Sequence, residues 1–221
     1  MYELSGEGPG WFGMKLKRIV LSGAWGAAAV LLACLLPAQG GNADSSTPFI
    51  ALSSVSVPEI PAKAAELVHA AAAADRDQTA RDVLRAASLI ARPGVLPYVV
   101  SGICRGNPEA AGAVVTTAIE LDPEDVLIFS KAALCAARGQ VEQIVFSASK
   151  AAPASSANVA LVAFWQWPSA KNLILAGLAG GRPDLRLYLE EAEIQVGPGD
   201  FEAVLKKAVQ LWTDASKGQA K

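Results

Sequence analysis

The chain has 221 residues, of which 52% are hydrophobic and 18% charged, and its formal net charge is −2. This balance excludes an intrinsically disordered chain, and the length suits one domain with processing segments. Without the leader described below, 16 basic and 19 acidic residues remain, a net charge of −3. With no excess of basic residues, we expect no nucleic acid partner and no electrostatic binding to an anionic membrane surface.

Residues 1–43 have the pattern of an N-terminal leader with a secretory signal peptide. Basic residues occur within 15–18, a mostly apolar run follows over 19–36, and small residues within 37–40 offer a cleavage site. Met14 directly precedes the basic residues, so we predict that translation starts there. Two alternatives stay open. The apolar run is nearly long enough for an uncleaved membrane anchor, and Cys34 lies in a segment similar to a lipoprotein lipidation site.

Residues 44–61 are rich in Ser, Thr and Pro. Pro58 and Pro61 disfavour a regular helix that runs through them, because proline lacks the backbone N–H and restricts the residue before it. We therefore predict an extended linker over 44–61.

Residues 62–153 contain short apolar runs that are separated by proline or glycine at a near-constant step. The separating residues are Pro93, Pro108, Pro123, Gly139 and Pro153. A step of about 15 residues accommodates an α-helix of ~11–12 residues, about 17 Å long, and a tight turn. Aligning the prolines also aligns apolar residues, so each segment presents one apolar face.

Helices of this length are not stable alone, so they must stack on one another. Short connections make neighbouring helices antiparallel. We therefore predict an all-α fold of tandem short antiparallel helices, an α-hairpin repeat or solenoid-like array over 62–153. Residues 154–221 are predicted to form a helical C-terminal cap, with a linker at 154–158 and helices at 169–179, 184–194 and from Asp200 onward.

The Pro-started segments of residues 64–153 resemble uncharacterised, alanine-rich exported bacterial proteins with many short helices. In plan they are also distantly similar to TPR and HEAT solenoids. The TPR pattern of an early Trp, a Gly-x-x-Tyr pair and a Pro at a 34-residue step is missing. The resemblance implies the architecture, and no functional residue carries over from it.

Catalytic patterns are weak in this chain. His69 is the only histidine, so neither a His-based triad nor a His-rich metal site can be built. Ser147 and Lys150 have the Ser-x-x-Lys spacing of penicillin-recognising enzymes, but the second element at 156–158 lies too close and no Lys-Thr-Gly follows. The acidic residues within 190–193 lie on one helix and are expected to be solvated. We expect no catalytic site, no cofactor and no metal.

Two pairs of residues are candidates for a structural or binding role. Cys104 and Cys135 fall at nearly equivalent places in the repeat, so a disulfide between them is one prediction and two small buried residues the alternative. Trp165 and Trp167 could form an interaction surface, and the alternative is an aromatic plug between array and cap.

Together these features predict an exported bacterial protein, periplasmic or secreted, that binds another protein or an envelope component, or supports an envelope structure. We expect attachment to the membrane or envelope only if the leader stays uncleaved or Cys34 is lipidated. Two other classes stay open: a cell-envelope hydrolase with an unfamiliar site, and a membrane-anchored structural protein.

Overall fold

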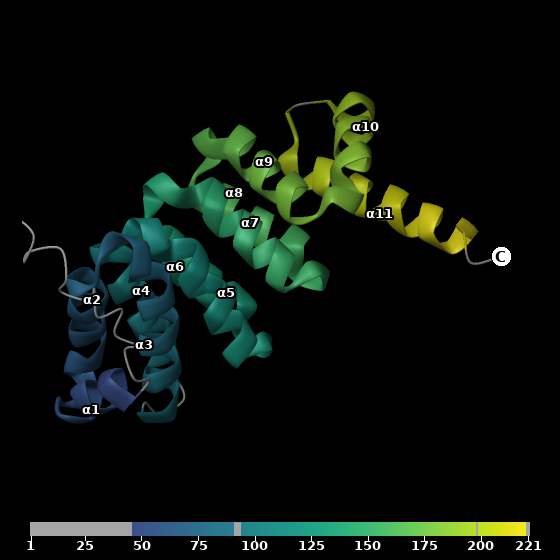
Figure 1. Ribbon diagram of the computed structural model, residues 1–221. Coiled ribbons are helices and arrows are strands. Elements are labelled where there is room, and N and C mark those ends of the chain that lie inside the picture. The colour runs from purple at the N-terminus through teal and green to yellow at the C-terminus, as the bar shows by residue number, and fades with distance from the viewer. Residues whose placement is uncertain (1–45, 91–93, 198, 220–221) are drawn as a thin grey trace, which may run out of the picture. The chain divides into compact units, whose positions relative to one another are not determined.

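The computed structural model describes residues 46–90, 94–197 and 199–219, and all regular structure in these ranges is helical (Figure 1). The predicted leader, with Met14 and Cys34, lies outside the described residues. The α-helices are α1 Ser46–Ser53, α2 Ile60–Ala70, α3 Arg76–Ile90, α4 Leu96–Gly106, α5 Ala111–Leu121, α6 Val126–Ala136, α7 Val141–Ala151, α8 Ser156–Gln166, α9 Lys171–Gly181, α10 Arg186–Val196 and α11 Phe201–Gln219. The predicted all-α tandem array is confirmed.

A 15-residue unit repeats from residue 108 to residue 197. Each unit has a 3-residue 3₁₀ turn, an 11-residue α-helix and one non-helical link residue. The turns before α5 to α10 are η3 Pro108–Ala110, η4 Pro123–Asp125, η5 Arg138–Gln140, η6 Pro153–Ser155, η7 Pro168–Ala170 and η8 Pro183–Leu185. Five of these six turns begin with proline, which suits this place because its φ is fixed and its missing N–H is not needed there.

The link residue between two units ends one helix and starts the next 3₁₀ turn. The Asn107 N–H donates to the Ile103 carbonyl of α4 (2.8 Å), and the Asn107 carbonyl accepts from the Ala110 N–H (3.1 Å). Arg182 does the same between α9 and η8, with bonds of 2.8 Å and 3.0 Å. Link residues leave the helical conformation, with φ near −143° at Asn107 and −129° at Arg182. Proline disfavours the helical conformation in the residue before it, and Ala137, which precedes Arg138, adopts a similar conformation with φ near −124°.

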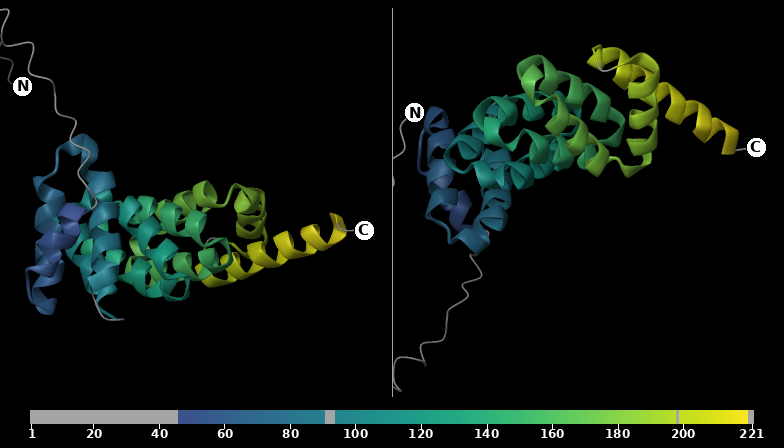
Figure 2. Two further views of the ribbon diagram at one scale, coloured as in Figure 1. Left: turned by 60° about the horizontal axis from the view of Figure 1, so that its bottom comes forward. Right: turned by 90° about the horizontal axis from the view of Figure 1, so that it is seen from above.

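The helices pack in two layers. Even-numbered helices α2, α4, α6 and α8 follow one another in one layer, and odd-numbered helices α3, α5, α7 and α9 in the other (Figures 1 and 2). The fourth residue of each repeat helix lies between the layers and is buried, from Val99 in α4 to Ile174 in α9. Because many other core residues are alanine, the layers can approach closely, but each buried methyl group contributes little free energy.

After α8, the layer of even-numbered helices is continued by α11. This helix packs on α8 and also on α10. Phe201, Val204 and Ala208 of α11 are buried, and the Phe201 ring stacks on Phe164 of α8 at 4.3 Å between centroids. Beyond these residues the helix projects past the others (Figure 2). A helical C-terminal cap is therefore present, and α11 is the helix that covers α8.

The predicted extended linker over 44–61 is wrong where the structure describes it. Residues 46–53 form α1, which contacts α2 and α3, and Leu52 of α1 is fully buried. Pro58 lies in η1 Val57–Glu59, and Pro61 is the second residue of α2. Both prolines occupy first-turn positions, where proline starts a helix instead of breaking it.

The predicted boundary at residue 153 does not coincide with a change in the helix pattern. The 15-residue unit continues through α8, α9 and α10. Residues 156–158 belong to α8, so the predicted linker at 154–158 is wrong. The helix predicted over 169–179 extends to Gly181, because Gly180 and Gly181 are the last two residues of α9. Within the described ranges, the structure contains no helix with the length and apolar character that a bilayer span requires.

Candidate functional site

Each repeat helix uses its eleven positions in the same way. Position 4 and position 8 face the other layer, as Val99 and Ile103 do in α4. Position 2 lies against position 7 of the next helix in the same layer: Pro61 of α2 meets Gly102 of α4, and Glu142 of α7 meets Gly177 of α9. With about 100° between successive residues, positions 3, 6 and 10 lie on the side of the helix away from positions 4 and 8. In the odd-numbered layer some of them contact the neighbouring helix, as Gln143 and Gly180 do, whereas Tyr98 and Trp165 of the even-numbered layer are exposed.

We call the residues at positions 3, 6 and 10 of α4, α6 and α8 the outer row. Its members are Tyr98, Ser101, Arg105, Ile128, Lys131, Cys135, Asn158, Leu161 and Trp165. Three large apolar side chains in this row are exposed, Tyr98 by 68%, Ile128 by 49% and Trp165 by 64%. Single exposed apolar residues are common, but these three occur on successive helices of one layer, Tyr98 and Ile128 in the first turn and Trp165 in the last turn.

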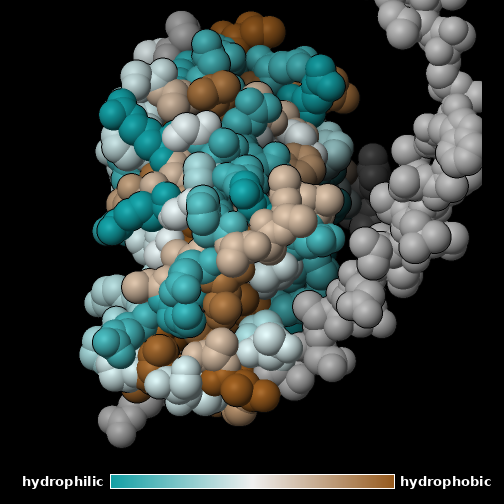
Figure 3. Space-filling view, turned by 60° about the vertical axis from the view of Figure 1, so that its left-hand side comes forward, coloured by the Kyte–Doolittle hydropathy of each residue, from teal (hydrophilic) through white to brown (hydrophobic). Residues whose placement is uncertain are grey.

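The surface elsewhere is mixed. Viewed from the side of α2, hydrophobic residues are interspersed with hydrophilic ones (Figure 3). Further exposed apolar residues include Leu89 in α3, Leu173 in α9 and Ile194 in α10. These lie on helices outside the outer row.

The two tryptophans predicted as an interaction surface have different environments. Trp165 is exposed in the last turn of α8. Trp167 is the link residue after α8 and is half-buried, and its indole Nε1–H donates to the Leu134 carbonyl of α6 (3.3 Å). The Arg138 guanidinium covers the Trp167 ring at 4.1 Å from the centroid. Trp167 therefore fills the space between α6 and α8, and Trp165 is the residue that a partner could reach.

The predicted disulfide between Cys104 and Cys135 is not formed, because both thiols are free. Cys104 is at position 9 of α4 and buried, and burial raises the pKa of its thiol to about 12. Cys135 is at position 10 of α6 and exposed, and its Sγ lies 3.2 Å from Gln166 Oε1 of α8. One residue of offset turns the two side chains in different directions, so the sulfurs do not meet.

Arg182 and Asp184 form an ion pair where the repeat array meets α11, and the Arg182 side chain is the more buried of the two. The Arg182 side chain is buried, and its Nε and Nη2 donate to the two carboxylate oxygens of Asp184 at 2.8 Å and 2.7 Å. Its Nη1 donates to the Pro153 carbonyl and to Ser156 Oγ. The guanidinium also lies 5.1 Å from the centroid of the Trp212 ring of α11. Arg182 thus joins the start of α8, η8 and α11.

The hydrogen bonds from Arg182 are the main reason that the pKa of Asp184 lies below its usual range, and partial burial opposes them. The Asp184 carboxylate is therefore ionised at neutral pH, and its charge balances that of Arg182. This pair has no net charge.

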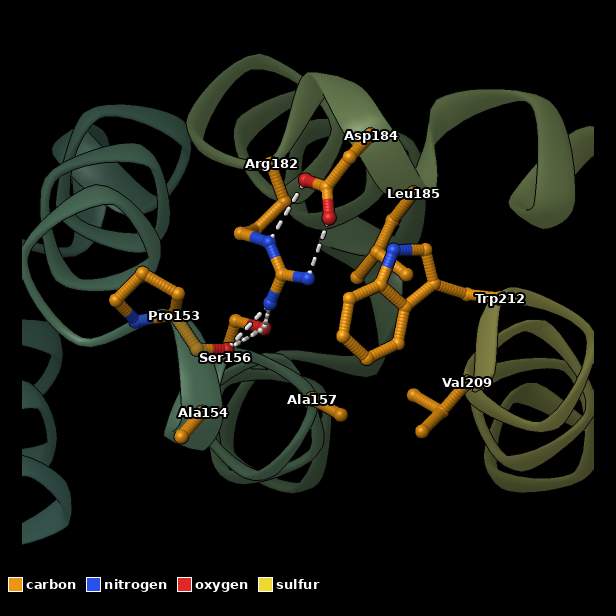
Figure 4. Close-up of a pocket in the computed structure, with 9 residues that line it drawn as sticks. All are labelled: Pro153, Ala154, Ser156, Ala157, Arg182, Asp184, Leu185, Val209 and Trp212. Carbon is orange, nitrogen blue, oxygen red and sulfur yellow. Dashed lines mark hydrogen bonds and ion pairs between the residues drawn. The ribbon is translucent and has the colours of Figure 1, made fainter. Parts of the chain in front are cut away.

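A cavity of about 480 Å³ lies beside this ion pair (Figure 4). Its lining residues are Pro153, Ala154, Ser156, Ala157, Arg182, Asp184, Leu185, Val209 and Trp212. In Figure 4, Ala157 of α8 faces Val209 and Trp212 of α11, with Arg182 above them. The cavity has mainly apolar walls and one polar edge, the composition that small-molecule sites have.

The catalytic patterns considered in the sequence do not converge in space. His69 is exposed in α2, and Ser147 is buried in α7 while Lys150 of the same helix is exposed and lies over the Phe146 ring. In the part of the chain that the structure describes, no three His, Cys, Asp or Glu side chains are grouped to hold a metal ion.

A site at Arg182, Asp184 and Trp212 was not predicted from the sequence. In register, Arg182 occupies the link position, where Asn107 is also polar and buried and donates to the Ala65 carbonyl. A polar residue at this repeat position was the available signal, but nothing in the sequence indicates that Trp212 packs against it.

Comparison of the chain with protein-family models, with curated proteins and with solved structures finds no match.

Proposed function

We propose that this chain is an exported helical-repeat protein that binds another protein or an envelope component through the outer row of α4, α6 and α8. The observation that carries this proposal is the exposure of Tyr98, Ile128 and Trp165 on packed helices of one layer. Aromatic residues are common at the centres of protein interfaces, and a partner that covers these side chains would remove apolar surface from water.

The repeat supports this function in a second way. Exposed members of the outer row, such as Tyr98 and Trp165, contribute little to the packing of the layers, so residues at these places can change with little loss of stability. The outer row also contains the basic residues Arg105 and Lys131. Apolar and basic residues on the same side of the layer suit a partner surface that has apolar and acidic groups.

The proposal that the protein is exported is based on the leader pattern of residues 1–43. This pattern predicts that the protein is found outside the cytoplasm. Fractionation of cells that make the full chain tests this part separately, because the protein is expected in the periplasm, the medium or the envelope. Recovery from the cytoplasm, with the leader still present, would contradict it.

Site-specific photo-crosslinking in the native host tests the binding surface. A photoreactive amino acid is placed at Tyr98, Ile128 or Trp165, and for comparison at Glu120 and Gln143, which lie at the outer positions of the odd-numbered helices α5 and α7. We expect one defined adduct from the first three sites and none from the comparison sites. Equal adducts from both layers, or none from either, would reject the outer row as the binding surface.

A further inference from the structure

The cavity between the start of α8, η8 and α11 is created by two small residues. Ala157 is at position 2 of α8, and the same position holds Leu127 in α6 and Leu187 in α10. Ala154 is the second residue of η6, where η3 and η4 have Glu109 and Glu124. The repeat therefore tolerates larger side chains at both positions, and the alanines leave open space next to α11.

The polar edge of the cavity is held in place before any ligand binds. Arg182 donates four hydrogen bonds, two to Asp184 and one each to the Pro153 carbonyl and Ser156 Oγ. A guanidinium held this firmly costs little additional ordering when a ligand binds. It has five N–H groups, so one remains for an acceptor on the ligand.

The charges of the site select against charged ligands. Arg182 and Asp184 neutralise one another, so a charged ligand would leave water without gaining a counterion of its own. Pro153, Val209 and the Trp212 ring form apolar walls. A volume of about 480 Å³ suits a molecule with one or two rings.

We propose that this cavity is a binding site for a small, uncharged, mainly apolar molecule with an aromatic ring and one hydrogen-bond acceptor. Its ring lies between Ala157 and the side chains of Val209 and Trp212, and its acceptor faces Arg182. The site is separate from the outer row and does not depend on the function proposed above.

Titration of the full chain with 2-naphthol, an uncharged bicyclic aromatic alcohol, tests the site. The readouts are saturable binding by calorimetry and a shift of the Trp212 indole N–H resonance, which Trp212→Phe identifies. We expect saturation together with a Trp212 shift, while the Trp165 resonance stays in place. Binding without a Trp212 shift, or no saturable binding, overturns the proposal.

Variants taken from the repeat itself make the test specific. Ala157→Leu, which copies α6 and α10, fills the cavity and is expected to weaken 2-naphthol binding at least tenfold. Ala62→Leu adds the same side chain at an exposed site of α2 and is expected to leave the affinity unchanged. An unchanged affinity in Ala157→Leu overturns the proposal.

Ala154→Glu, which copies η3 and η4, provides a second test should Ala157→Leu fail to fold. It places a carboxylate at the apolar wall, and we expect at least a tenfold loss of affinity. Binding of 2-naphthol to this variant as tightly as to the unmodified chain also overturns the proposal. Tighter binding of the anion 2-naphthoate than of 2-naphthol would overturn the assignment of an uncharged ligand.

Discussion

Gly102 of α4 lies so close to Pro61 of α2 that a β-carbon on Gly102 would stand 2.6 Å from the Pro61 carbonyl oxygen. Gly177 of α9 has the same repeat position and the same relationship to the Glu142 carbonyl of α7. In both places, glycine lets two helices of one layer approach backbone to backbone. Glycine inside a helix costs about 1 kcal/mol of stability relative to alanine. The close packing of the two helices offsets this cost.

We therefore predict that Gly102→Ala destabilises the fold although alanine favours helix. The added methyl group forces the α2 backbone away, and overpacking of this kind typically costs about 1–3 kcal/mol. Urea denaturation followed by circular dichroism measures the change in the free energy of unfolding.

Gly139→Ala is the matched control for Gly102→Ala. A β-carbon at Gly139 meets nothing within 4 Å, and Gly139 is not among the glycines with positive φ. The substitution is expected to leave stability unchanged or to raise it by up to about 1 kcal/mol, because it reduces the entropy of the unfolded chain. Equal destabilisation by both substitutions would show that the close helix contact is not the cause.

Removal of the Arg182 side chain is predicted to destabilise the fold more than removal of an exposed charged side chain. Arg182→Ala removes the guanidinium donor from Asp184, Ser156 Oγ and the Pro153 carbonyl, which keeps only its bond from the Ser156 hydroxyl, and it uncovers one face of the Trp212 ring. We expect a loss of about 2–3 kcal/mol, at the lower end for a broken buried pair because the Asp184 side chain is 46% exposed.

Arg186→Ala is the control for Arg182→Ala. Arg186 forms an ion pair with Glu190 at 3.5 Å, and both side chains are largely exposed. A surface pair of this kind contributes less than about 1 kcal/mol, so the unfolding midpoint should change little. If the two substitutions lowered stability equally, Arg182 would have no special role at the junction with α11.

The ion pair also predicts how stability depends on pH. The pKa of Asp184 is lowered in the folded chain by its hydrogen bonds from Arg182, and the pKa of Glu109 is lowered by a bond to its own backbone and by Arg76. A carboxyl with a lowered folded pKa stabilises the fold above its unfolded pKa, which is about 3.8 for Asp, and this contribution disappears as the pH falls through the folded pKa. Stability should therefore decline below about pH 4.

Asp184→Asn separates this contribution from that of other carboxyl groups. The variant cannot titrate at this position, so its free energy of unfolding should fall less steeply between pH 5 and pH 2 than that of the unmodified chain. Glu109 still titrates and leaves a residual slope. Identical pH profiles for the two proteins would contradict a lowered pKa at Asp184.

The repeat step at Pro108 and Pro123 was sufficient to predict an all-α tandem array, because proline fixes both the turn and the link residue before it. The full extent of the repeat was not predicted. Pro168 and Pro183 continue the same step, but residues 154–221 were assigned to a linker and a C-terminal cap, because the last repeats of an array need one. Gly139 was taken as a separating residue, whereas Arg138 holds the first place of η5.

The candidate sites were less predictable than the fold, since they depend on which side chains meet. Trp165 and Trp167 are two residues apart, and the helix end places one outside and one between α6 and α8. The apolar face of the last helix, from Phe201 to Trp212, is visible in the sequence. The sequence does not indicate that this face packs on α8, which is what brings Trp212 to Arg182.

The different exposure of Cys104 and Cys135 predicts that the two free thiols react at different rates, which a disulfide between them would prevent. Cys135 is exposed, whereas Cys104 is buried and the pKa of its thiol is raised to about 12, so at pH 8 Cys104 is both protonated and covered. We expect iodoacetamide to label Cys135 in the folded protein within minutes and Cys104 only after unfolding in guanidinium. Digestion and mass spectrometry of the labelled chain distinguish the peptides. A peptide pair linked through Cys104 and Cys135 in the non-reduced digest would restore the disulfide. Labelling of both cysteines at equal rates would contradict the burial of Cys104 between the layers.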